Sequence, residues 1–505
     1  WPRSDTMTPL DRRASGVLLH LTCLPSPWGV GDLGPPARDF AARLGAAGQR
    51  YWQVLPLNPT SDAAGESPYF SSSSRAGNPL LISLEDLAEE GLLSRQEAAP
   101  PADDTEGRAD FGRARALKLP RLAAAAARFE RGGDDPDYRA FCNQEADWLE
   151  DHALFTALKA QDPRAWDQWP DALKFREPAA LADARRRLAP AVAAEKRLQY
   201  FFQRQWRRLH GHCADAGVGL FGDMPIYVNR DSVDVWARPE LFQLDEALNP
   251  IAESGVPPDY FSATGQLWRN PLYDWERLAA EDFQWWVDRL GALLRRLDVL
   301  RIDHFRGLAQ YWRVPAGAET AMDGSWEDVP SYALFDRLCE ALQPFPVVAE
   351  DLGVITPDVT ALRDHYGLPG MVLLHFAFDN DDPGHPYLPE NHPENAVAYL
   401  GTHDNNTTRG WLEEDLDPAA RQRLEARIDG GGSEACVAQL VDLLMASPAR
   451  TAIVCAQDLL ALPAAARMNT PGEAADNWRW QLTNAAFDAL PLAQLQRAAA
   501  ACGRR

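Results

Sequence analysis

Short apolar runs recur along the chain, and most of them end in a polar or glycine-containing turn. Many are separated by stretches rich in Ala, Leu and Arg that suit helices. Eight runs stand out, at residues 16–21, 51–55, 218–228, 299–305, 347–351, 371–376, 396–404 and 451–458. This alternation predicts an α/β protein, and eight strands favour a closed (β/α)8 barrel over an open, doubly wound sheet. No Gly-x-Gly-x-x-Gly follows a predicted strand in a dinucleotide-binding context.

The runs are unevenly spaced, which predicts insertions in the barrel. We expect an N-terminal tail at residues 1–15, with 1–6 preceding a natural start at Met7, and a catalytic barrel at 16–505. A mainly helical subdomain is expected at about 58–215, because this gap is too long for one crossover helix. A second excursion, at about 229–297, includes residues 256–275, which are rich in Pro, Gly and aromatic side chains. We expect these residues to form an irregular loop, neither helix nor strand, that covers the substrate.

Composition narrows the range of functions. The 505 residues include seven cysteines, an odd number without a Cys-x-x-Cys pair, so we expect reduced thiols and a cytoplasmic location. The N-terminus lacks the apolar segment of a signal peptide, and no run approaches 18 consecutive apolar residues. The formal net charge of −23 argues against nucleic acid or an anionic membrane as partner and suits a neutral ligand. Seventeen Trp residues are compatible with sugar binding, although most Trp side chains in any protein belong to its core.

Three acidic residues lie at the ends of predicted strands: Asp303 in V-L-R-I-D-H-F-R-G, Glu350 in P-V-V-A-E-D-L-G, and Asp404 in Y-L-G-T-H-D-N-N-T-T. A parallel α/β barrel places its chemistry at the carboxyl ends of its strands. Two carboxyl groups close together there can cleave a glycosidic bond, one as nucleophile and the other as acid/base. The third can hold the substrate and its developing positive charge. The pattern therefore points to sugar chemistry.

The neighbours of these acids suggest how each is tuned, and each has a structural alternative. Arg301 shares a strand face with Asp303 and would keep it ionised, as a nucleophile requires, but the two residues are also compatible with a buried ion pair. Glu350 ends a run of small apolar residues, where desolvation raises the pKa of a carboxyl and favours an acid; a helix cap or a loop charge is the alternative. His403 beside Asp404 suits sugar hydroxyls better than a metal, because no second His stands at ligand spacing.

Further motifs extend along nearly the whole chain: S-G-V-L-L-H-L from Ser15, S-P-Y from Ser67, A-G-N-P-L-L-I from Ala76, G-D-M-P-I-Y-V from Gly222, P-P-D-Y-F-S-A-T-G-Q-L-W from Pro257 and R-M-N-T-P-G from Arg467. Together with the three acidic motifs, they resemble the retaining α-glucan enzymes of the α-amylase superfamily. More specifically, they resemble the amylomaltases, or 4-α-glucanotransferases, of glycoside hydrolase family 77. The A-G-N-P and P-P-D-Y-F-S strings point to this group rather than to α-amylases at large. The resemblance implies a barrel without a separate C-terminal β-domain, no cofactor, no metal, and transfer of α-1,4-glucan segments.

The resemblance also implies roles for individual residues. Asp303 would be the nucleophile that forms a covalent glucosyl intermediate, Glu350 the general acid/base, and Asp404 the stabiliser of the transition state. The implied substrate-binding residues are Arg301, His403, His304, Asp223, Tyr69, Gln266, Trp268 and Asn469.

For four of these substrate-binding residues, the resemblance implies a more specific position in the site. Tyr69 would be a platform for the donor sugar, Gln266 and Trp268 would cover the acceptor side, and Asn469 would lie at the far rim of the cleft. The donor would be a maltooligosaccharide or starch, and the acceptor a glucan or glucose. Monomer and homodimer both stay open.

The chain departs from the family pattern in several places. Arg269 stands where Gly is usual, Asn406 where Asp is common, His375 where Gln is usual, and Leu308 where Phe is usual. Residues 328–330, Asp-Val-Pro, lack a frequent Gly-Pro-Gly. Because none of these positions is one of the three acids, we expect acceptor binding and chain-length preference to differ, but not the reaction class.

These inferences combine into a two-step, configuration-retaining transfer, with the carboxyl groups of Asp303 and Glu350 expected about 5–5.5 Å apart. The acceptor must compete with water, so we expect an aromatic loop around Tyr260, Phe261 and Trp268 to exclude water. An α-1,4-glucan hydrolase of the α-amylase type is the main alternative, since it uses the same carboxylates. A catalytically silent glycan-binding protein is disfavoured by the presence of all three acids. A phosphorylated substrate is disfavoured because no phosphate-type glycine loop is evident.

Overall fold

In the computed structural model, which describes residues 9–101, 107–258, 263–473 and 476–504, eight parallel strands form a nearly closed barrel. The strands are β1 (Ala14–Leu18), β2 (Tyr51–Gln53), β3 (Gly219–Met224), β6 (Val299–Ile302), β9 (Val347–Ala349), β10 (Gly370–Leu373), β11 (Ala396–Tyr399) and β12 (Thr451–Cys455), in the order β10-β11-β12-β1-β2-β3-β6-β9. A 2.9 Å hydrogen bond from the Ala349 N–H to the Pro369 carbonyl joins the two ends of this order. All eight predicted strands are confirmed. Each is shorter than its apolar run, because the residues that follow leave the sheet.

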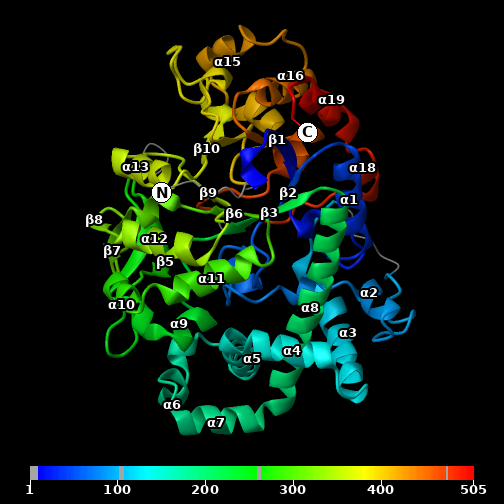
Figure 1. Cartoon of the computed structure of the whole chain (residues 1–505), viewed down its shortest axis with the longest axis vertical. Coiled ribbons are helices and arrows are strands. Elements are labelled where there is room, and N and C mark those ends of the chain that lie inside the picture. The colour runs from blue at the N-terminus through cyan, green and yellow to red at the C-terminus, as the bar shows by residue number, and fades with distance from the viewer. Residues whose placement is uncertain (1–8, 102–106, 259–262, 474–475, 505) are drawn as a thin grey trace.

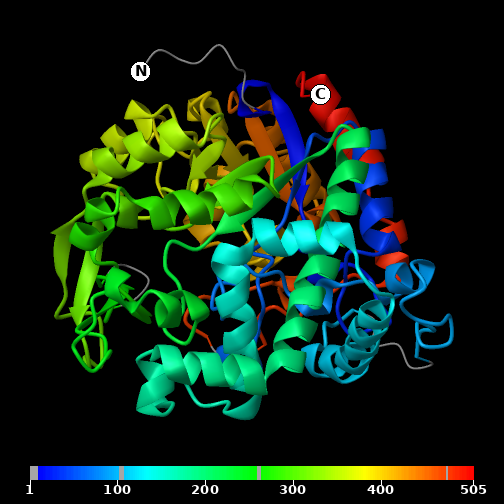
Figure 2. The ribbon, with the colours of Figure 1, turned by 60° about the horizontal axis from the view of Figure 1, so that its bottom comes forward.

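Helices cover the outside of the barrel (Figures 1 and 2). Outside the segment between β2 and β3, the helices are α1 (Pro35–Ala46), α9 (Val233–Ala237), α10 (Trp275–Ala280), α11 (Gln284–Leu294), α12 (Ser331–Ala341), α13 (Pro357–His365), α14 (Thr408–Gly410), α15 (Pro418–Glu425), α16 (Ser433–Ala446), α17 (Ala456–Leu459), α18 (Asn484–Asp488) and α19 (Leu492–Ala501). Beyond β12, the described residues contain helices and turns but no strand, as expected for a chain without a separate C-terminal β-domain. None of the helices within the described residues is long and apolar enough to cross a membrane.

The described residues between β2 and β3 form seven helices: α2 (Leu84–Glu89), α3 (Phe111–Arg131), α4 (Pro136–Gln144), α5 (Ala146–Gln161), α6 (Asp171–Lys174), α7 (Pro178–Arg187) and α8 (Ala189–Asp215). Local sequence explains where two of them begin, since Asp110 and Asp135 each accept a backbone N–H as N-cap. The 27-residue α8 runs from this helical group back to the barrel (Figure 1). The helical content agrees with the expectation for 58–215, while the boundaries of the insertion stay a prediction.

The second excursion is a correction to the sequence-based expectation. Residues 256–275 are not irregular throughout, because β5 (Gln266–Pro271) pairs with β4 (Ala252–Val256) in an antiparallel sheet. That sheet has the order β5-β4-β7-β8, with β7 (Gln310–Pro315) and β8 (Ser325–Asp328) coming from the chain after β6. It lies beside α12 at the edge of the barrel (Figure 1). β5 is an edge strand that pairs with β4 alone, and its sequence lacks the apolar run by which the barrel strands were predicted.

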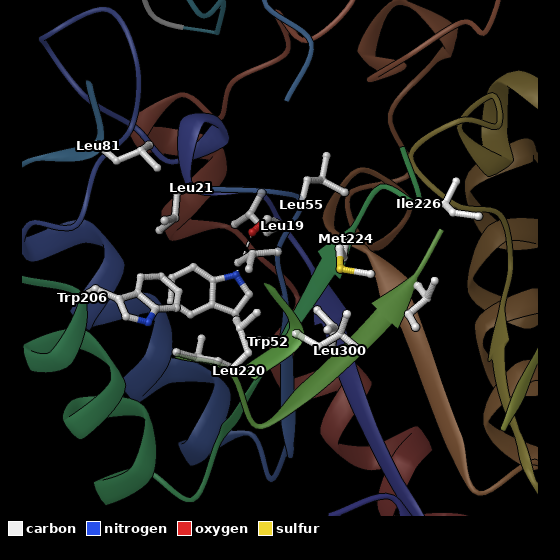
Figure 3. Packing of buried hydrophobic residues seen from close by; sticks show 14 of the residues in the cluster. Leu19, Leu21, Trp52, Leu55, Leu81, Trp206, Leu220, Met224, Ile226 and Leu300 are labelled. Carbon is white, nitrogen blue, oxygen red and sulfur yellow. Dashed lines mark hydrogen bonds between the residues drawn. The ribbon is translucent and has the colours of Figure 1, made fainter. Parts of the chain in front are cut away.

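The core has an inner and an outer layer, because side chains on a strand alternate between the two faces of the barrel. Tyr51 and Phe221 belong to the cluster inside the barrel, whereas their strand neighbours Trp52 and Leu220 belong to the cluster that packs against the helices. Figure 3 shows Trp52 and Leu220 beside Trp206 of α8. The indole N–H of Trp52 donates to the Leu19 carbonyl at 2.7 Å, so this buried polar group is satisfied. Much of the Trp content therefore serves the core.

Gly16 of β1 gives a test of this packing. A Cβ atom at this position would lie 2.4 Å from the carbonyl oxygen of Tyr51 in the neighbouring strand. Gly16→Ala is therefore expected to lower the free energy of unfolding by about 1–3 kcal/mol. Gly211→Ala is the matched control, because the exposed Gly211 in α8 has nothing within 4 Å of its added Cβ. It is expected to raise that free energy by about 0.5–1 kcal/mol. Chemical denaturation measures both, and shifts in the same direction would contradict the packing described.

Candidate active site

The three predicted acids lie at the carboxyl ends of barrel strands. Asp303 directly follows β6, Glu350 directly follows β9, and Asp404 lies in the loop between β11 and α14. Asp223 near the end of β3 is the register partner of Arg301 in β6. The fold thus brings these five residues from four strands to one end of the barrel, where an α/β barrel builds its active site.

Arg301 connects the carboxylates of Asp223 and Asp303. Its Nη1 lies 2.9 and 2.7 Å from the two carboxylate oxygens of Asp223, and its Nη2 lies 2.8 Å from Oδ1 of Asp303. Its Nε faces the sulfur of Met371 at 3.4 Å. The Arg301 side chain is 4% exposed, whereas that of Asp303 is 29% exposed. The buried ion pair that was expected as the alternative is present, and Arg301 also orients the more exposed Asp303 toward solvent, while the catalytic interpretation stays a prediction.

Glu350 is held by backbone groups beside Asp303. The N–H of His304 donates to its Oε2 at 2.7 Å, and the N–H of Leu352 donates to its Oε1 at 2.9 Å. His304 has φ +53° and ψ +50°, a left-handed conformation that a side chain other than glycine rarely adopts. Strain of this kind is found at functional sites, and here it occurs at the residue whose N–H holds Glu350. Glu350 is therefore neither a helix cap nor a free loop charge.

Burial raises the pKa of both Asp303 and Glu350. For Asp303, desolvation is the largest effect and exceeds the favourable charge of Arg301, so its pKa rises to about 6. For Glu350, desolvation is again the largest effect; the charge of Arg301 opposes it and the charge of Asp303 adds to it, so its pKa rises to about 7. Arg301 therefore limits the rise in the pKa of Asp303, but the pKa of Asp303 still lies above its usual range. Because the two carboxyls interact, their protons leave in coupled steps.

Asp404 is positioned by Asn469, which the resemblance placed at the far rim of the cleft. The Asn469 side-chain amide donates to Oδ1 of Asp404 at 2.6 Å, and its backbone N–H donates to the His403 carbonyl at 3.1 Å. Nε2 of His403 lies 3.3 Å from the other Asp404 oxygen. The expectation of a distant rim residue is wrong, because the chain after α17 folds back over the Asp404 loop.

Tyr69 joins the two halves of this cluster. Its hydroxyl donates to Oδ2 of Asp223 at 2.7 Å and lies 2.8 Å from Nε2 of His403. Because that hydroxyl proton is used on Asp223, His403 is the donor in the second contact, which places a proton on Nε2. The rings of Tyr69 and His403 are stacked at 5.4 Å and 11°. One ring face of the expected sugar platform therefore packs on His403.

Gln266 and Trp268 lie on one face of β5 and approach the catalytic loop. The Trp268 indole donates to Oε1 of Gln266 at 3.2 Å. The Trp268 ring meets the His304 ring edge to face at 4.8 Å. This contact joins the antiparallel sheet to the residue that holds Glu350. Tyr260 and Phe261, which were expected in the same covering loop, lie outside the described residues.

Sequence reasoning did not single out two residues that lie close to the predicted site residues. Arg467 donates from Nη2 to the Asp404 carbonyl at 2.6 Å, and the R-M-N-T-P-G motif contained a signal for it. His20 accepts the Leu55 N–H at 3.2 Å, and burial, followed by the charge of His403, lowers its pKa to about 3. A polar residue inside the apolar run at 16–21 was the available signal for His20.

The four single residues that depart from the family pattern lie in three different structural environments. Arg269 is on the antiparallel sheet, where its side chain is 55% exposed and lies 3.2 Å from Glu253. Asn406 and His375 are both buried near the Asp404 loop. The Asn406 amide donates to Asp415 at 3.1 Å. The Asp that is common at residue 406 would place a second carboxylate beside that of Asp415, and the two would repel each other. Leu308 is fully buried in the core.

The described residues contain no group of three or more His, Cys, Asp or Glu side chains arranged to hold a metal ion. The side chains gathered at the site are carboxyls, guanidiniums, imidazoles and a phenol. Such groups bind sugar hydroxyls, and two adjacent carboxyls that differ in pKa can act as base or nucleophile and as acid.

Comparison with known proteins agrees with this chemistry. The family model described as 4-alpha-glucanotransferase matches residues 19–486. The 4-alpha-glucanotransferase of Thermus thermophilus is 47% identical over 480 residues, which cover 93% of this chain and 95% of that protein. The 4-alpha-glucanotransferase of Synechocystis sp. is 47% identical over 481 residues, or 94% of each chain. The amylomaltase from Streptococcus agalactiae in complex with acarbose has a TM-score of 0.92 at 37% identity, covering 98% of this chain and 100% of that chain.

Arg269 provides a test of the departure on β5. Its φ of +62° is in the left-handed region, which explains why glycine suits this position. Arg269→Gly is expected to raise the free energy of unfolding by about 0.5–1 kcal/mol, because relief of strain exceeds the loss of an ion pair whose arginine is 55% exposed. Arg269→Ala is the control, since it removes the same ion pair with Glu253 but keeps a Cβ atom at positive φ. Urea denaturation of both variants checks this, and a glycine variant less stable than the alanine variant would rule out strain at Arg269.

Proposed function

Because this chain belongs to the family of 4-α-glucanotransferases and shares its activity, we propose that Asp303, Glu350 and Asp404 carry out a retaining double displacement on α-1,4-glucans. The observation that carries this assignment is the pair of carboxyls at the ends of β6 and β9. Asp303 is fixed by the Arg301 guanidinium, and Glu350 is fixed by two backbone N–H groups. Each carboxyl is therefore oriented before a sugar arrives.

In the first step, the carboxylate of Asp303 attacks the anomeric carbon of the donor. Glu350 gives its proton to the glycosidic oxygen, the bond between that oxygen and the anomeric carbon breaks, and the reducing-end segment leaves as an alcohol. The raised pKa of Glu350 keeps a useful fraction of this carboxyl protonated near neutral pH. Asp404 faces the developing positive charge of the sugar, and Asn469 holds one of its oxygens at 2.6 Å.

In the second step, the Glu350 carboxylate takes the proton from the 4-OH of an acceptor glucan or glucose. The acceptor oxygen attacks the anomeric carbon, and the ester bond to Asp303 breaks. Two inversions give net retention of configuration. The expected separation of about 5–5.5 Å between the two carboxyl groups stays a prediction.

Substrate binding is assigned to the groups around the three acids. Asp223, Tyr69 and His403 form a connected set of hydrogen-bonding side chains on one side of Asp303. Gln266 and Trp268 approach from β5 and are proposed to contact the acceptor, since Trp268 packs against His304, whose N–H holds Glu350. The net charge of −23 and the acarbose complex of the Streptococcus agalactiae amylomaltase support a neutral oligosaccharide as ligand.

The proposal includes a cytoplasmic setting and excludes nucleic acid and membranes as partners. The free thiols of all seven cysteines support the reducing compartment. The acidic composition supports the exclusion of anionic polymers and surfaces.

The roles of Asp303 and Glu350 are separated by a donor that needs no protonation. With maltotriose as donor, Asp303→Ala and Glu350→Gln are both expected to lose at least about 10³-fold in kcat/KM, and the parent chain to give a ladder of longer maltooligosaccharides. With an α-maltosyl fluoride donor, Glu350→Gln is expected to recover fluoride release, because fluoride leaves without an acid. Asp303→Ala is expected to stay inactive, because no nucleophile remains. Fluoride-electrode rates and chromatography of the sugars measure both, and the opposite pattern would exchange the two assignments.

The raised pKa values predict the pH dependence of the first step. Activity needs ionised Asp303 and protonated Glu350, so kcat/KM is expected to fall below about pH 6 and above about pH 7. On the alkaline side the fall reflects loss of the Glu350 proton. Glu350→Gln, measured with α-maltosyl fluoride, is therefore expected to lack that limb while keeping the acidic one. An alkaline limb that persists in this variant would assign it to another group.

A further inference from the structure

His375 contacts the beginning of the segment that carries His403 and Asp404. It lies in the turn after β10, and its backbone N–H donates to the Leu400 carbonyl at 3.0 Å. Its ring packs directly against Gly401, where an added Cβ atom would lie 2.6 Å from the ring carbon Cε1. Any side chain at residue 401 would therefore displace this ring.

The same imidazole also contacts the end of that segment. Nε2 of His375 lies 3.0 Å from the Thr408 hydroxyl oxygen. The Thr408 N–H donates at 2.6 Å to Oδ1 of Asp458, a buried carboxyl in α17. Residues 400 and 408 are thus tied to two neighbouring elements of the barrel, and His375 is involved at both points.

Between these two points, the segment is braced internally. The Asn405 side-chain oxygen accepts the N–H of Thr402 at 2.9 Å and its hydroxyl at 3.0 Å. The Thr402 hydroxyl in turn lies 3.3 Å from the Asp404 N–H. A shift at either end of such a compact turn moves Asp404 as well, rather than being absorbed along the loop.

The His375 ring is also held by a stacking contact. The ring is stacked on Trp411 at 4.6 Å and 9°, and the residue is buried. Burial lowers the pKa of His375 to about 3, so the ring is neutral at physiological pH and adds no charge to the site. Its effect on the site is therefore geometric.

We propose that His375 is a positioning residue for the reaction: by contacting both ends of segment 400–408, it sets the position of Asp404 relative to the sugar. This inference rests on the proposed role of Asp404 as stabiliser of the transition state. It gives a structural role to one residue that departs from the family pattern, because His375 stands where Gln is usual. A glutamine side chain at this position would offer an amide donor for Thr408 but no ring to stack on Trp411.

The test is a double-mutant cycle with His375→Ala and Asp404→Asn. His375→Ala is expected to lower kcat for maltotriose by about 10–100-fold while KM changes less than about threefold, because a misplaced Asp404 affects the transition state more than the bound donor. In the Asp404→Asn background, the same replacement is expected to have little further effect, since residues that act through one group are not additive. His375→Gln is expected to recover part of kcat through its amide donor.

His392→Ala is the matched control. His392 is also buried, and its ring nitrogens bond to Ser447 at 2.9 Å and the Tyr387 carbonyl at 2.9 Å, away from the Asp404 loop. Its loss is expected to lower the melting temperature without lowering kcat at temperatures where the variant is folded.

The results of this experiment distinguish the positioning role of His375 from the role of Asp404 itself. Equal loss of kcat on His375→Ala in both backgrounds, or a kcat unchanged by His375→Ala, would overturn the positioning role while leaving the function intact. Full activity of Asp404→Asn alone would instead overturn the assigned role of Asp404, and this inference with it. If His375→Ala does not fold, the same cycle run with His375→Gln decides by the same criteria.

Discussion

The guanidinium of Arg301 is the interaction on which the carboxylate cluster depends. Four acidic side chains, those of Asp223, Asp303, Glu350 and Asp404, meet at one end of the barrel, and a buried carboxylate without a partner is strongly disfavoured. Arg301 contacts two of them directly within 2.9 Å. An arginine suits this place better than a lysine, because its charge persists when it is buried and its planar fork serves two partners. The other hydrogen-bonding partners described above are a phenol, an imidazole, an amide and backbone N–H groups.

Among the described residues, Arg301 is the only Arg or Lys that forms a salt bridge with any of these four carboxylates, and this shortage of paired positive charge suits the proposed catalysis. If each acid had its own cation, each would be ionised over the whole working range, and none could donate a proton. Here desolvation raises the pKa of Asp303 and Glu350, and Arg301 lies in direct contact with Asp303 but not with Glu350. In the proposed mechanism, the nucleophile Asp303 thus has a cation in direct contact, and the acid Glu350 has the higher pKa. The same low-dielectric setting that raises these pKa values also strengthens the interactions of the oriented groups with a developing charge.

The sequence predicted the parts of this protein that local pattern determines. The eight strands are buried on both faces, so they read as apolar runs, and the acids were found because each directly ends or closely follows such a run. The strand β5 was missed because its six residues, Gln266–Pro271, contain no β-branched residue and no apolar run, although its partner β4 is close in the sequence. The contact of Asn469 with Asp404 was missed because 65 residues separate them, and only the closed barrel brings them together. The positive φ of Arg269 had a sequence signal, the usual glycine, but that signal was interpreted as a change in substrate binding.

How far a residue lies beyond its strand determines what holds it in place. The Asp303 N–H donates to the Met224 carbonyl at 2.9 Å and the Glu350 N–H to the Ile302 carbonyl at 3.1 Å, so both residues continue the backbone pairing of the barrel itself. Asp404 lies beyond the end of β11, outside the backbone hydrogen bonding between the barrel strands. It is held by side-chain contacts, whereas Asp303 and Glu350 are held by backbone pairing. Backbone pairing tolerates any side chain, whereas a side-chain contact depends on the residue that makes it. Two departures from the family pattern, at positions 375 and 406, lie near Asp404, where a changed side chain alters the contacts that position the acid.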